Sequence, residues 1–169
     1  MHAGYVADVL IGILSDTHGR AAAMAAGVAA LRGRGAEYFI HCGDVGGEDV
    51  LDALAGLPSA FIFGNTDFDR VSLTQYAQDL VITCYGNVGD FELAGKRFAL
   101  LHGDDDRLKR RLLDAQQHDY LLQGHTHVPH DDRVGRTRVI NPGALHRAKV
   151  KTVALLDTDA DTVSFITIE

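Results

Sequence analysis

Five short apolar segments of the sequence are each followed, within a few residues, by side chains that can bind a metal ion. Segments that are apolar throughout are typical of strands buried on both faces of a sheet. Polar residues just after such strands lie at their carboxyl ends, where open α/β sheets bind ligands. The segments are residues 9–14, 38–42, 60–63, 98–101 and 120–123, and the polar residues are Asp16, His18, Asp44, Asn65, Asp67, His102, His125 and His127. We therefore expect a metal site at one edge of a sheet.

The remaining pattern predicts a mixed α/β (α+β) fold. Helices are expected over residues 20–34 and 48–54, with another beginning near Arg107 and a short one around residues 71–77. Further short strands are expected at residues 81–83, 89–93, 97–101, 136–140, 152–156 and 163–168. The turn Ala94-Gly95-Lys96 favours antiparallel pairing of the strands on either side of it. Because no linker or repeat interrupts the pattern, we expect a single domain over residues 1–169.

Composition and charge restrict the class of protein. A chain of 169 residues with 46% hydrophobic content can bury one core. No apolar run approaches the roughly 20 residues that span a bilayer, and residues 9–14 are too short for a secretory signal, so we expect a cytoplasmic protein without a membrane partner. Cys42 and Cys84 form no CxxC pair and are expected to be reduced. The net charge of −7 argues against duplex nucleic acid as a partner, but it permits a small anionic substrate in a locally positive pocket.

The types of residue favour transition metals. Aspartate and histidine together select manganese, iron, cobalt, nickel or zinc, whereas calcium sites use oxygen ligands alone. The seven candidate ligands are too many for one ion, but two divalent ions that share a bridging carboxylate account for them, with manganese as our first expectation. Such a centre carries net positive charge and attracts phosphate. A metal hydroxide formed there would attack phosphorus in line. The ligands are Asp16, His18, Asp44, Asn65, His102, His125 and His127.

The same residues resemble the motifs of a known family. The resemblance is to the calcineurin-like metallophosphoesterase superfamily, whose five ordered motifs are matched by Asp16-x-His18, Gly43-Asp44, Gly64-Asn65-x-Asp67, His102-Gly103 and Gly124-His125-x-His127. The chain length, and Asn141-Pro142-Gly143 after the histidine pair, are most similar to its small bacterial and archaeal phosphodiesterase branch. The resemblance implies two mixed β-sheets packed as a sandwich and flanked by helices, in four layers, with the metals at strand ends.

The resemblance also implies a role for each motif residue. One metal ion would be bound by Asp16, His18 and His127, the second by Asn65, His102 and His125, and Asp44 would bridge the two. Because His125 and His127 would serve different ions, we expect an extended backbone at residues 124–127, where alternation turns the two rings in different directions. The implied reaction is hydrolysis of a small phosphodiester, such as a cyclic or modified nucleotide.

Three positions bear on the substrate and on the proton that the leaving group needs. Several branches of the family have a histidine two residues after the asparagine, where this chain has Asp67. Asp67 could be a protonated acid, or it could orient Asn65 or a water, and we favour the orienting role. Asp104 stands where small phosphodiesterases often have a histidine, so substrate contacts are expected to differ. Arg20 follows the first motif and is a candidate phosphate clamp.

Other interpretations stay open from the sequence. A phosphomonoesterase acting on a small metabolite would use the same metal residues, and a non-catalytic metal-binding scaffold, similar to a eukaryotic retromer subunit, would keep the fold alone. Apolar strand edges within residues 80–93 could support a homodimer. His41 could support a metal ligand from behind. The remaining histidines are expected to be packed or surface residues, namely His2, His118, His130 and His146.

Overall fold

The computed structural model describes residues 8–169, so the prediction for His2 lies outside the described residues. No helix in this range is both long and apolar enough to cross a bilayer. The elements are β1 (Leu10–Leu14), α1 (Ala21–Arg32), β2 (Tyr38–His41), α2 (Glu48–Leu51), a 3₁₀ turn (Asp52–Leu54), β3 (Ser59–Phe61), α3 (Arg70–Asp79), β4 (Thr83–Cys84), β5 (Val88–Leu93), β6 (Lys96–Leu101), α4 (Asp106–Ala115), β7 (Tyr120–Leu122), β8 (His130–Val134), β9 (Thr137–Asn141), β10 (Lys151–Asp157) and β11 (Thr162–Ile168).

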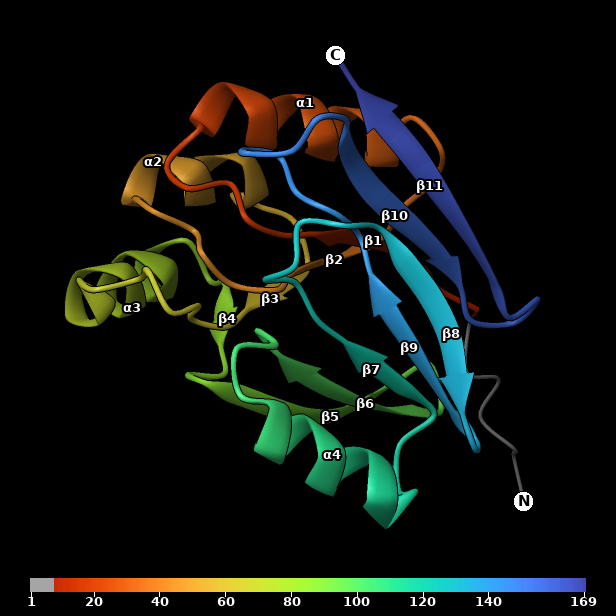
Figure 1. Cartoon of the computed structure of the whole chain (residues 1–169). Helices are drawn as coiled ribbons and strands as arrows, with labels where there is room; N and C mark the ends of the chain where they lie inside the picture. Colours follow the sequence, from red (N-terminus) through yellow and green to blue (C-terminus); the bar gives the residue numbers. More distant parts are fainter. Residues whose placement is uncertain (1–7) are drawn as a thin grey trace, which may run out of the picture.

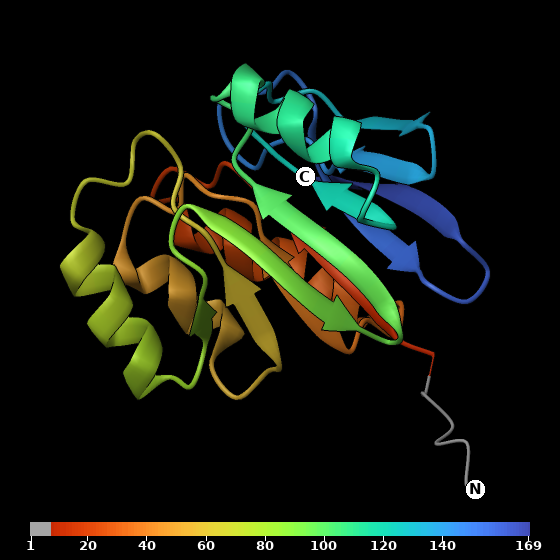
Figure 2. The ribbon, with the colours of Figure 1, turned by 90° about the horizontal axis from the view of Figure 1, so that it is seen from below.

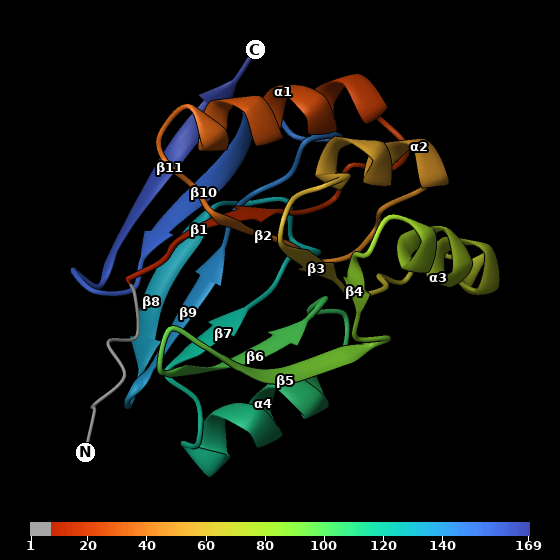
Figure 3. The ribbon, with the colours of Figure 1, turned by 180° about the vertical axis from the view of Figure 1, so that it is seen from behind.

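The strands form two mixed sheets. The first has the order β11-β10-β1-β2-β3-β4, with β1 to β4 parallel and β10 and β11 antiparallel to their neighbours. The second has the order β5-β6-β7-β9-β8, with β6, β7 and β9 parallel and both edge strands antiparallel. The sheets lie face to face, with α1, α2 and α3 outside the first and α4 outside the second (Figures 1 and 3). The predicted sandwich flanked by helices is confirmed.

The core between the sheets follows from the alternation of residues along each strand. Ile11 and Ile13 of β1 point toward the second sheet, where they are fully buried in one cluster with Phe98 of β6 and Leu122 of β7. Seen from below, the β5–β6 hairpin lies across the first sheet (Figure 2). This apolar layer fixes the spacing between the sheets, and therefore the distance between the loops at their edges.

A separate core covers the outer face of the first sheet. Leu14 alternates with Ile13 and packs with Met24 and Leu31 of α1. Gly12 permits close packing of this helix, because a Cβ atom there would lie 2.8 Å from Cδ1 of Leu31. On the second sheet, α4 is held through the buried residue Leu113. Both outer layers keep the strands rigid beneath the loops.

The structure contains most of the expected elements and one that was not expected. The predicted hairpin is formed by β5 and β6, and its turn residues Ala94 and Gly95 have left-handed backbone with φ of 52° and 70°. The unexpected element is β8, which pairs with β9 at the edge of the second sheet. All of its residues are exposed, and its sequence HDDRV lacks the alternation that identifies a strand. Charged residues on an edge strand discourage pairing with other chains.

Candidate metal centre

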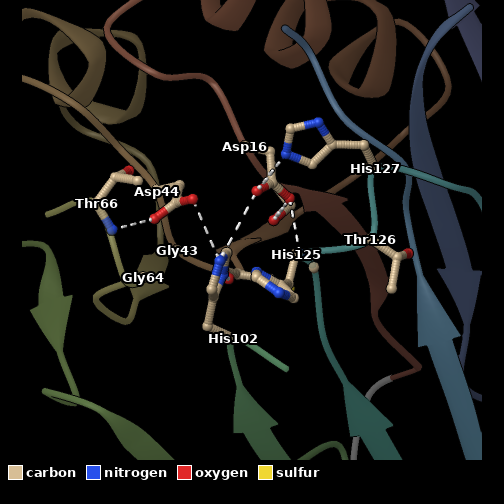
Figure 4. Close-up of polar contacts among 12 residues, drawn as sticks. Asp16, Gly43, Asp44, Gly64, Thr66, His102, His125, Thr126 and His127 are labelled. Atoms are coloured by element: carbon tan, nitrogen blue, oxygen red, sulfur yellow. Dashed lines mark hydrogen bonds and ion pairs between the residues drawn. The ribbon is translucent and has the colours of Figure 1, made fainter. Parts of the chain in front are cut away.

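The loops that follow the central strands meet at one edge of the sandwich. Backbone hydrogen bonds join the loops after β1 and β2, from the Asp16 N–H to the Gly43 carbonyl (3.1 Å) and from the His18 N–H to the Asp44 carbonyl (2.9 Å). In the other sheet, the Gly124 N–H after β7 donates to the His102 carbonyl after β6 (2.9 Å). The side chains from both sheets converge between these loops (Figure 4).

The carboxylate of Asp16 lies at the centre of the group. The residue is fully buried, and its Oδ2 atom accepts a hydrogen bond from the His125 N–H at 3.1 Å. Its Oδ1 atom is buried and accepts no hydrogen bond from residues 8–169. Burying a carboxylate is costly unless a cation pairs with it, so this oxygen fits a metal ion held jointly with the imidazoles around it. The nearest Nε2 atoms to Oδ1 are those of His127 (3.1 Å), His18 (3.8 Å) and His102 (3.9 Å).

Asp44 lies between histidines that come from different sheets. Its Oδ2 atom is 3.3 Å from Nε2 of His102 and 3.7 Å from Nε2 of His18, and its Oδ1 atom accepts a hydrogen bond from the Thr66 N–H at 2.9 Å. Burial raises the pKa of Asp44, but the attraction of His102 and the hydrogen bond from Thr66 outweigh it and hold this pKa well below its ordinary value. Asp44 is therefore an anion placed to share charge with two cations.

Two glycines allow these side chains to approach one another. Gly43 has φ of +97°, and a Cβ atom there would lie 2.7 Å from Nδ1 of His102. A Cβ atom on Gly64 would lie 2.1 Å from Oδ1 of Asp44. The glycine in each of these motifs is therefore a steric requirement of the cluster.

His102 presents its Nε2 atom to the carboxylates. Its Nδ1–H donates to the Cys42 carbonyl at 2.8 Å, which leaves the lone pair of the neutral ring on Nε2. Burial lowers the pKa of His102, but Asp44 and the Cys42 carbonyl overcome this and raise it to about 9. The carboxylates thus favour positive charge at this position, which a divalent metal ion would also supply.

His18 and His127 complete the opposite side of the cluster. Their Nε2 atoms are 3.4 Å apart, and both face Oδ1 of Asp16. The Nδ1–H of His127 donates to the Arg147 carbonyl at 3.3 Å, so its Nε2 atom is free to bind a metal ion. Burial is the main cause that lowers the pKa of His18, and a lowered pKa favours the neutral form that binds metals.

Five of the seven predicted ligands form two overlapping sets. In each set the ligand atoms lie within 4.8 Å of one another, and Asp16 belongs to both. His125 and Asn65 are exposed and lie at the rim. The His125 ring is 5.1 Å from that of His102 between centroids, and Asn65 precedes the residue that donates to Asp44. The sets are Asp16, His18 and His127, and Asp16, Asp44 and His102.

The candidate ligands have an unusual backbone conformation. Non-glycine residues with left-handed backbone cost about 1–3 kcal/mol each and persist where the surrounding structure imposes them. Five such residues in one cluster indicate that the position of the side chains takes precedence over local stability. They are Asp16 (φ 54°), His18 (45°), Asp44 (55°), His125 (70°) and His127 (60°).

The extended backbone expected at residues 124–127 is therefore wrong. The segment is a tight turn in which the Thr126 N–H donates to the Gly124 carbonyl at 2.9 Å. Asn141 holds this turn, because its Nδ2 atom donates to the Gly124 carbonyl (2.8 Å) and to Oγ1 of Thr126 (3.0 Å). The two histidine rings do point in different directions, as expected. The cause is the left-handed backbone of the residues on either side of Thr126, and not the alternation of a strand.

The carboxylate of Asp67 binds backbone rather than solvent. It is 3% exposed and accepts hydrogen bonds from the N–H groups of Gly64 (2.8 Å), Gly46 (2.9 Å) and Val45 (3.1 Å). Both carboxylate oxygens are thereby engaged with backbone from the two loops. This geometry favours the orienting role over the acid, because Asp67 fixes the loop that carries Asn65 against the loop that carries Asp44.

His41 lies behind the cluster, on a buried network. Its Nδ1 atom accepts a hydrogen bond from the Gly43 N–H at 3.2 Å, and its Nε2 atom is 3.1 Å from Oγ1 of Thr17. Burial lowers the pKa of His41 to about 4, so the ring is neutral at pH 7. Its ring therefore contacts the loops that carry Asp16 and Asp44 at Thr17 and Gly43, and no hydrogen bond joins it to a candidate ligand side chain within residues 8–169.

The remaining candidates lie around the cluster. Arg20 and Asp104 are both exposed and do not contact the carboxylates, and Asp104 borders a concavity of about 240 Å³ that includes His102. His118 is buried, as expected, and His130 is exposed on β8. His146 was expected to be a packed or surface residue, and its ring is 5.8 Å from that of His18 between centroids. Its position shortly after the Asn-Pro-Gly turn is the signal in the sequence that points to the site.

Comparisons with known proteins identify both a family and a fold. The model of the calcineurin-like phosphoesterase superfamily domain matches residues 9–161. Phosphodiesterase MJ0936 of Methanocaldococcus jannaschii is 28% identical over 166 residues, which cover 94% of this chain and 99% of that protein. A solved archaeal phosphodiesterase has a TM-score of 0.88 at 24% identity and covers 95% of this chain and 100% of its own. Vps29 of Entamoeba histolytica has a TM-score of 0.65 at 19% identity, with 95% and 100% covered.

The two structural matches show the fold, and the family model shows the family. The model covers nearly the whole described chain, including every motif residue from Asp16 to His127. Its members are metallophosphoesterases, a name that implies divalent metal ions, and the donor set around Asp16 fits such ions. The resemblance found in the sequence is confirmed. The chain belongs to the calcineurin-like phosphoesterase superfamily and is a phosphoric ester hydrolase.

Proposed function

We propose that the chain is a dinuclear, metal-dependent phosphodiesterase that hydrolyses a small phosphodiester such as a cyclic or modified nucleotide. The observation that carries the proposal is the position of Asp44, whose Oδ2 atom lies 3.3 Å from Nε2 of His102 and 3.7 Å from Nε2 of His18. These histidines come from different sheets, and the seven candidate ligands around this carboxylate are more than one four- to six-coordinate ion can hold. A bridging carboxylate between two ions accounts for this position.

Each ion would have its own set of protein ligands. Asp16, His18 and His127 would hold one ion, and their ligand atoms already lie within 4.8 Å of one another. Asn65, His102 and His125 would hold the other, with Asp44 between the two. Manganese is the expected metal, with iron, nickel, cobalt and zinc as alternatives that the same donors accept.

The chain prepares the centre for a phosphate ester. Two divalent cations held there would supply an activated water and would neutralise charge on the phosphoryl oxygens. The Nδ1 hydrogen bonds of His102 and His127 to backbone carbonyls fix both rings with Nε2 directed inward. Asn65 and His125 are the exposed candidates at the rim and would be the first of these ligands that a substrate reaches.

Two alternatives use the same fold. A phosphomonoesterase would differ only in the substrate that its pocket accepts. A non-catalytic scaffold would keep the fold alone, but here each motif position carries a residue able to bind a metal ion, which supports hydrolysis. The similarity to phosphodiesterase MJ0936 favours a diester over a monoester.

The test compares bis-p-nitrophenyl phosphate with p-nitrophenyl phosphate, in manganese and in chelator. We expect turnover of the diester to need metal, and to fall by at least about tenfold in Asn65→Ala, the size of effect found for residues that support a metal site. Gln78→Ala removes an exposed carboxamide on α3 and is the matched control. A preference for the monoester would support the phosphatase alternative, and no turnover with any transition metal would favour the scaffold.

A further inference from the structure

The surfaces on the two sides of the candidate metal centre differ in charge. Beside Thr66 and Asp67, the surface is hollowed and lined by the acidic residues Glu48, Asp49 and Asp69. The opposite side, beside His18 and His127, has the basic residues Arg20, Arg147 and Lys151 together with His146. We call these last four residues the basic subsite. In a chain with a net charge of −7, this concentration of positive charge stands out.

The basic subsite borders a depression of about 560 Å³. Arg20, His146 and Lys151 border it, all three have exposed surface, and the surface inside the depression is almost wholly apolar. The buried side chain of Leu145 and the alanines at the start of α1 form its apolar lining. A charged group bound here would have cations beside it and an apolar surface beneath it, so the depression suits an organic molecule that carries an anion.

The subsite is anchored to the metal centre by its backbone. The Leu145 N–H donates to the Ser15 carbonyl at 3.2 Å, and the Arg147 carbonyl accepts from Nδ1 of His127 at 3.3 Å. Arg147 has left-handed backbone with φ of 54°, so its loop is constrained. A substrate held at the metal centre could therefore reach the subsite without a change in the fold.

The cations of the subsite have no acidic partner within residues 8–169. Arg20, Arg147 and Lys151 form no ion pair there, whereas several other arginines of the chain pair with aspartates. Arg20, His146 and Lys151 lie around one depression, and Arg147 directly follows His146 in the chain. Unpaired cations that converge beside a reaction centre attract anionic substrate groups.

The first turn of α1 reinforces this charge. Arg20 is its N-cap residue and makes no capping hydrogen bond, and the first turn contains no acidic residue. The positive end of the helix dipole is therefore not neutralised by the chain itself. It adds to the charge of the side chains but would not make a site without them.

We propose that the basic subsite binds a second phosphate group, carried on one arm of the phosphodiester that is cleaved at the metal centre. The inference rests on the proposed function and narrows its substrate class to phosphodiesters with a further phosphate. A terminal phosphate monoester and the next phosphate of a nucleotide chain share this chemistry. The scissile phosphate itself is assigned to the metal ions, so Arg20 acts on the arm of the substrate.

The test uses substrates that differ only in the second phosphate. Thymidine 5′-(p-nitrophenyl phosphate) is compared with its 3′-phosphorylated form, and a third substrate with a 3′-methyl phosphate separates a terminal phosphate from one within a chain. We expect the second phosphate to raise kcat/KM about tenfold, as two or three partly screened charge contacts would. This preference should weaken as salt concentration rises.

Variants show which residues cause the preference. In Arg20→Ala/Lys151→Ala the ratio of kcat/KM between the two substrates should fall to about one, whatever the absolute rates. In Arg34→Ala/Lys109→Ala, which removes the same charges at distant exposed or half-buried positions, the ratio should stay as in the wild type. If the double variant slows both substrates equally and keeps the ratio, Arg20 and Lys151 act on the scissile phosphate and the inference is overturned.

The outcomes separate the inference from the function on which it rests. Equal turnover of both substrates by the wild type overturns the subsite and leaves the phosphodiesterase intact. If neither substrate is cleaved, the proposed function fails. The subsite is then tested by the binding of nucleotides that differ in one phosphate group. Thymidine 3′,5′-bisphosphate should then bind the manganese-loaded protein about tenfold more tightly than thymidine 5′-monophosphate, and equal dissociation constants by calorimetry would overturn it.

Discussion

The Nε2 atom of His102 lies 3.3 Å from the Oδ2 atom of Asp44, although the two residues follow strands of different sheets. The contact links the two halves of the sandwich through the charge at the candidate metal centre. When no metal is bound, the charge at this centre depends on whether His102 is protonated. Burial lowers the pKa of His102, but Asp44 and the Cys42 carbonyl raise it to about 9.

Metal binding should therefore release a proton from His102. At pH 7.5 the ring of the metal-free protein is protonated, since its pKa of about 9 lies above this pH, and a metal ligand must be neutral. The measurement adds manganese to the metal-free protein in weak buffer with a pH indicator. The number of protons that His102 releases on metal binding should fall to zero as pH rises through about 9, because the ring is then already neutral in the metal-free protein. A release that grows over this range would come from water instead and would contradict the assignment.

Replacing Asp16 should separate stability from metal binding. Asp16→Asn keeps the shape of a fully buried side chain but removes a charge that lies close to Asp44. We expect a rise of a few degrees in the Tm of the metal-free protein, as a stabilisation of about 1 kcal/mol gives in a chain of this size. The variant should also lose bound metal, measured by elemental analysis. A lower Tm in chelator would show that the carboxylate stabilises the fold without metal.

The role of Asp67 can be tested with the leaving group. If Asp67 orients the loop of Asn65, Asp67→Asn should slow p-nitrophenyl and phenyl diesters by the same factor. It should also destabilise the fold by about 1–3 kcal/mol, because buried N–H groups lose an acceptor. If Asp67 were the general acid, Asp67→Asn would slow the phenyl diester far more than the p-nitrophenyl diester, because only the phenyl leaving group needs a proton. Asp114→Asn, at an exposed position of α4, is the control for the change in charge.

His41 should make the fold sensitive to mild acid. Burial lowers its pKa to about 4, while in the unfolded chain the pKa is about 6.5. Between these values the unfolded state binds the extra proton, so stability falls as pH drops from about 6.5 toward 4. His41→Gln should reduce this slope in urea unfolding at pH 5 and pH 7 in chelator, and His130→Gln, on the exposed strand β8, should not. An unchanged slope in His41→Gln would contradict this account.

The sequence was sufficient to predict what depends on burial. Residues 9–14 and 38–42 are apolar because sheets and helices cover both of their faces, and that pattern identifies the strands and the loops that follow them. The order of the motif residues then predicts the cluster around Asp16. Strand β8 was not predicted for the opposite reason. All of its residues are exposed, so its sequence has no alternation of apolar and polar residues.

Tertiary contacts determine what the sequence could not predict. The left-handed turn at His125 and His127 is held by Asn141, a residue from another strand, so no local pattern specifies it. His146 reaches His18 only because the loop after β9 is anchored to Ser15. Both features depend on contacts between segments that are far apart in the chain.

The most direct test of the account is the number of metal ions that the reaction needs. Metal-free protein is titrated with manganese while bound metal and turnover of bis-p-nitrophenyl phosphate are followed together. The account predicts little activity at one equivalent, a rise with the second, and a plateau at two ions per chain. Full activity at one ion per chain would contradict the bridging role of Asp44, and activity that persists in chelator would contradict the metal centre itself.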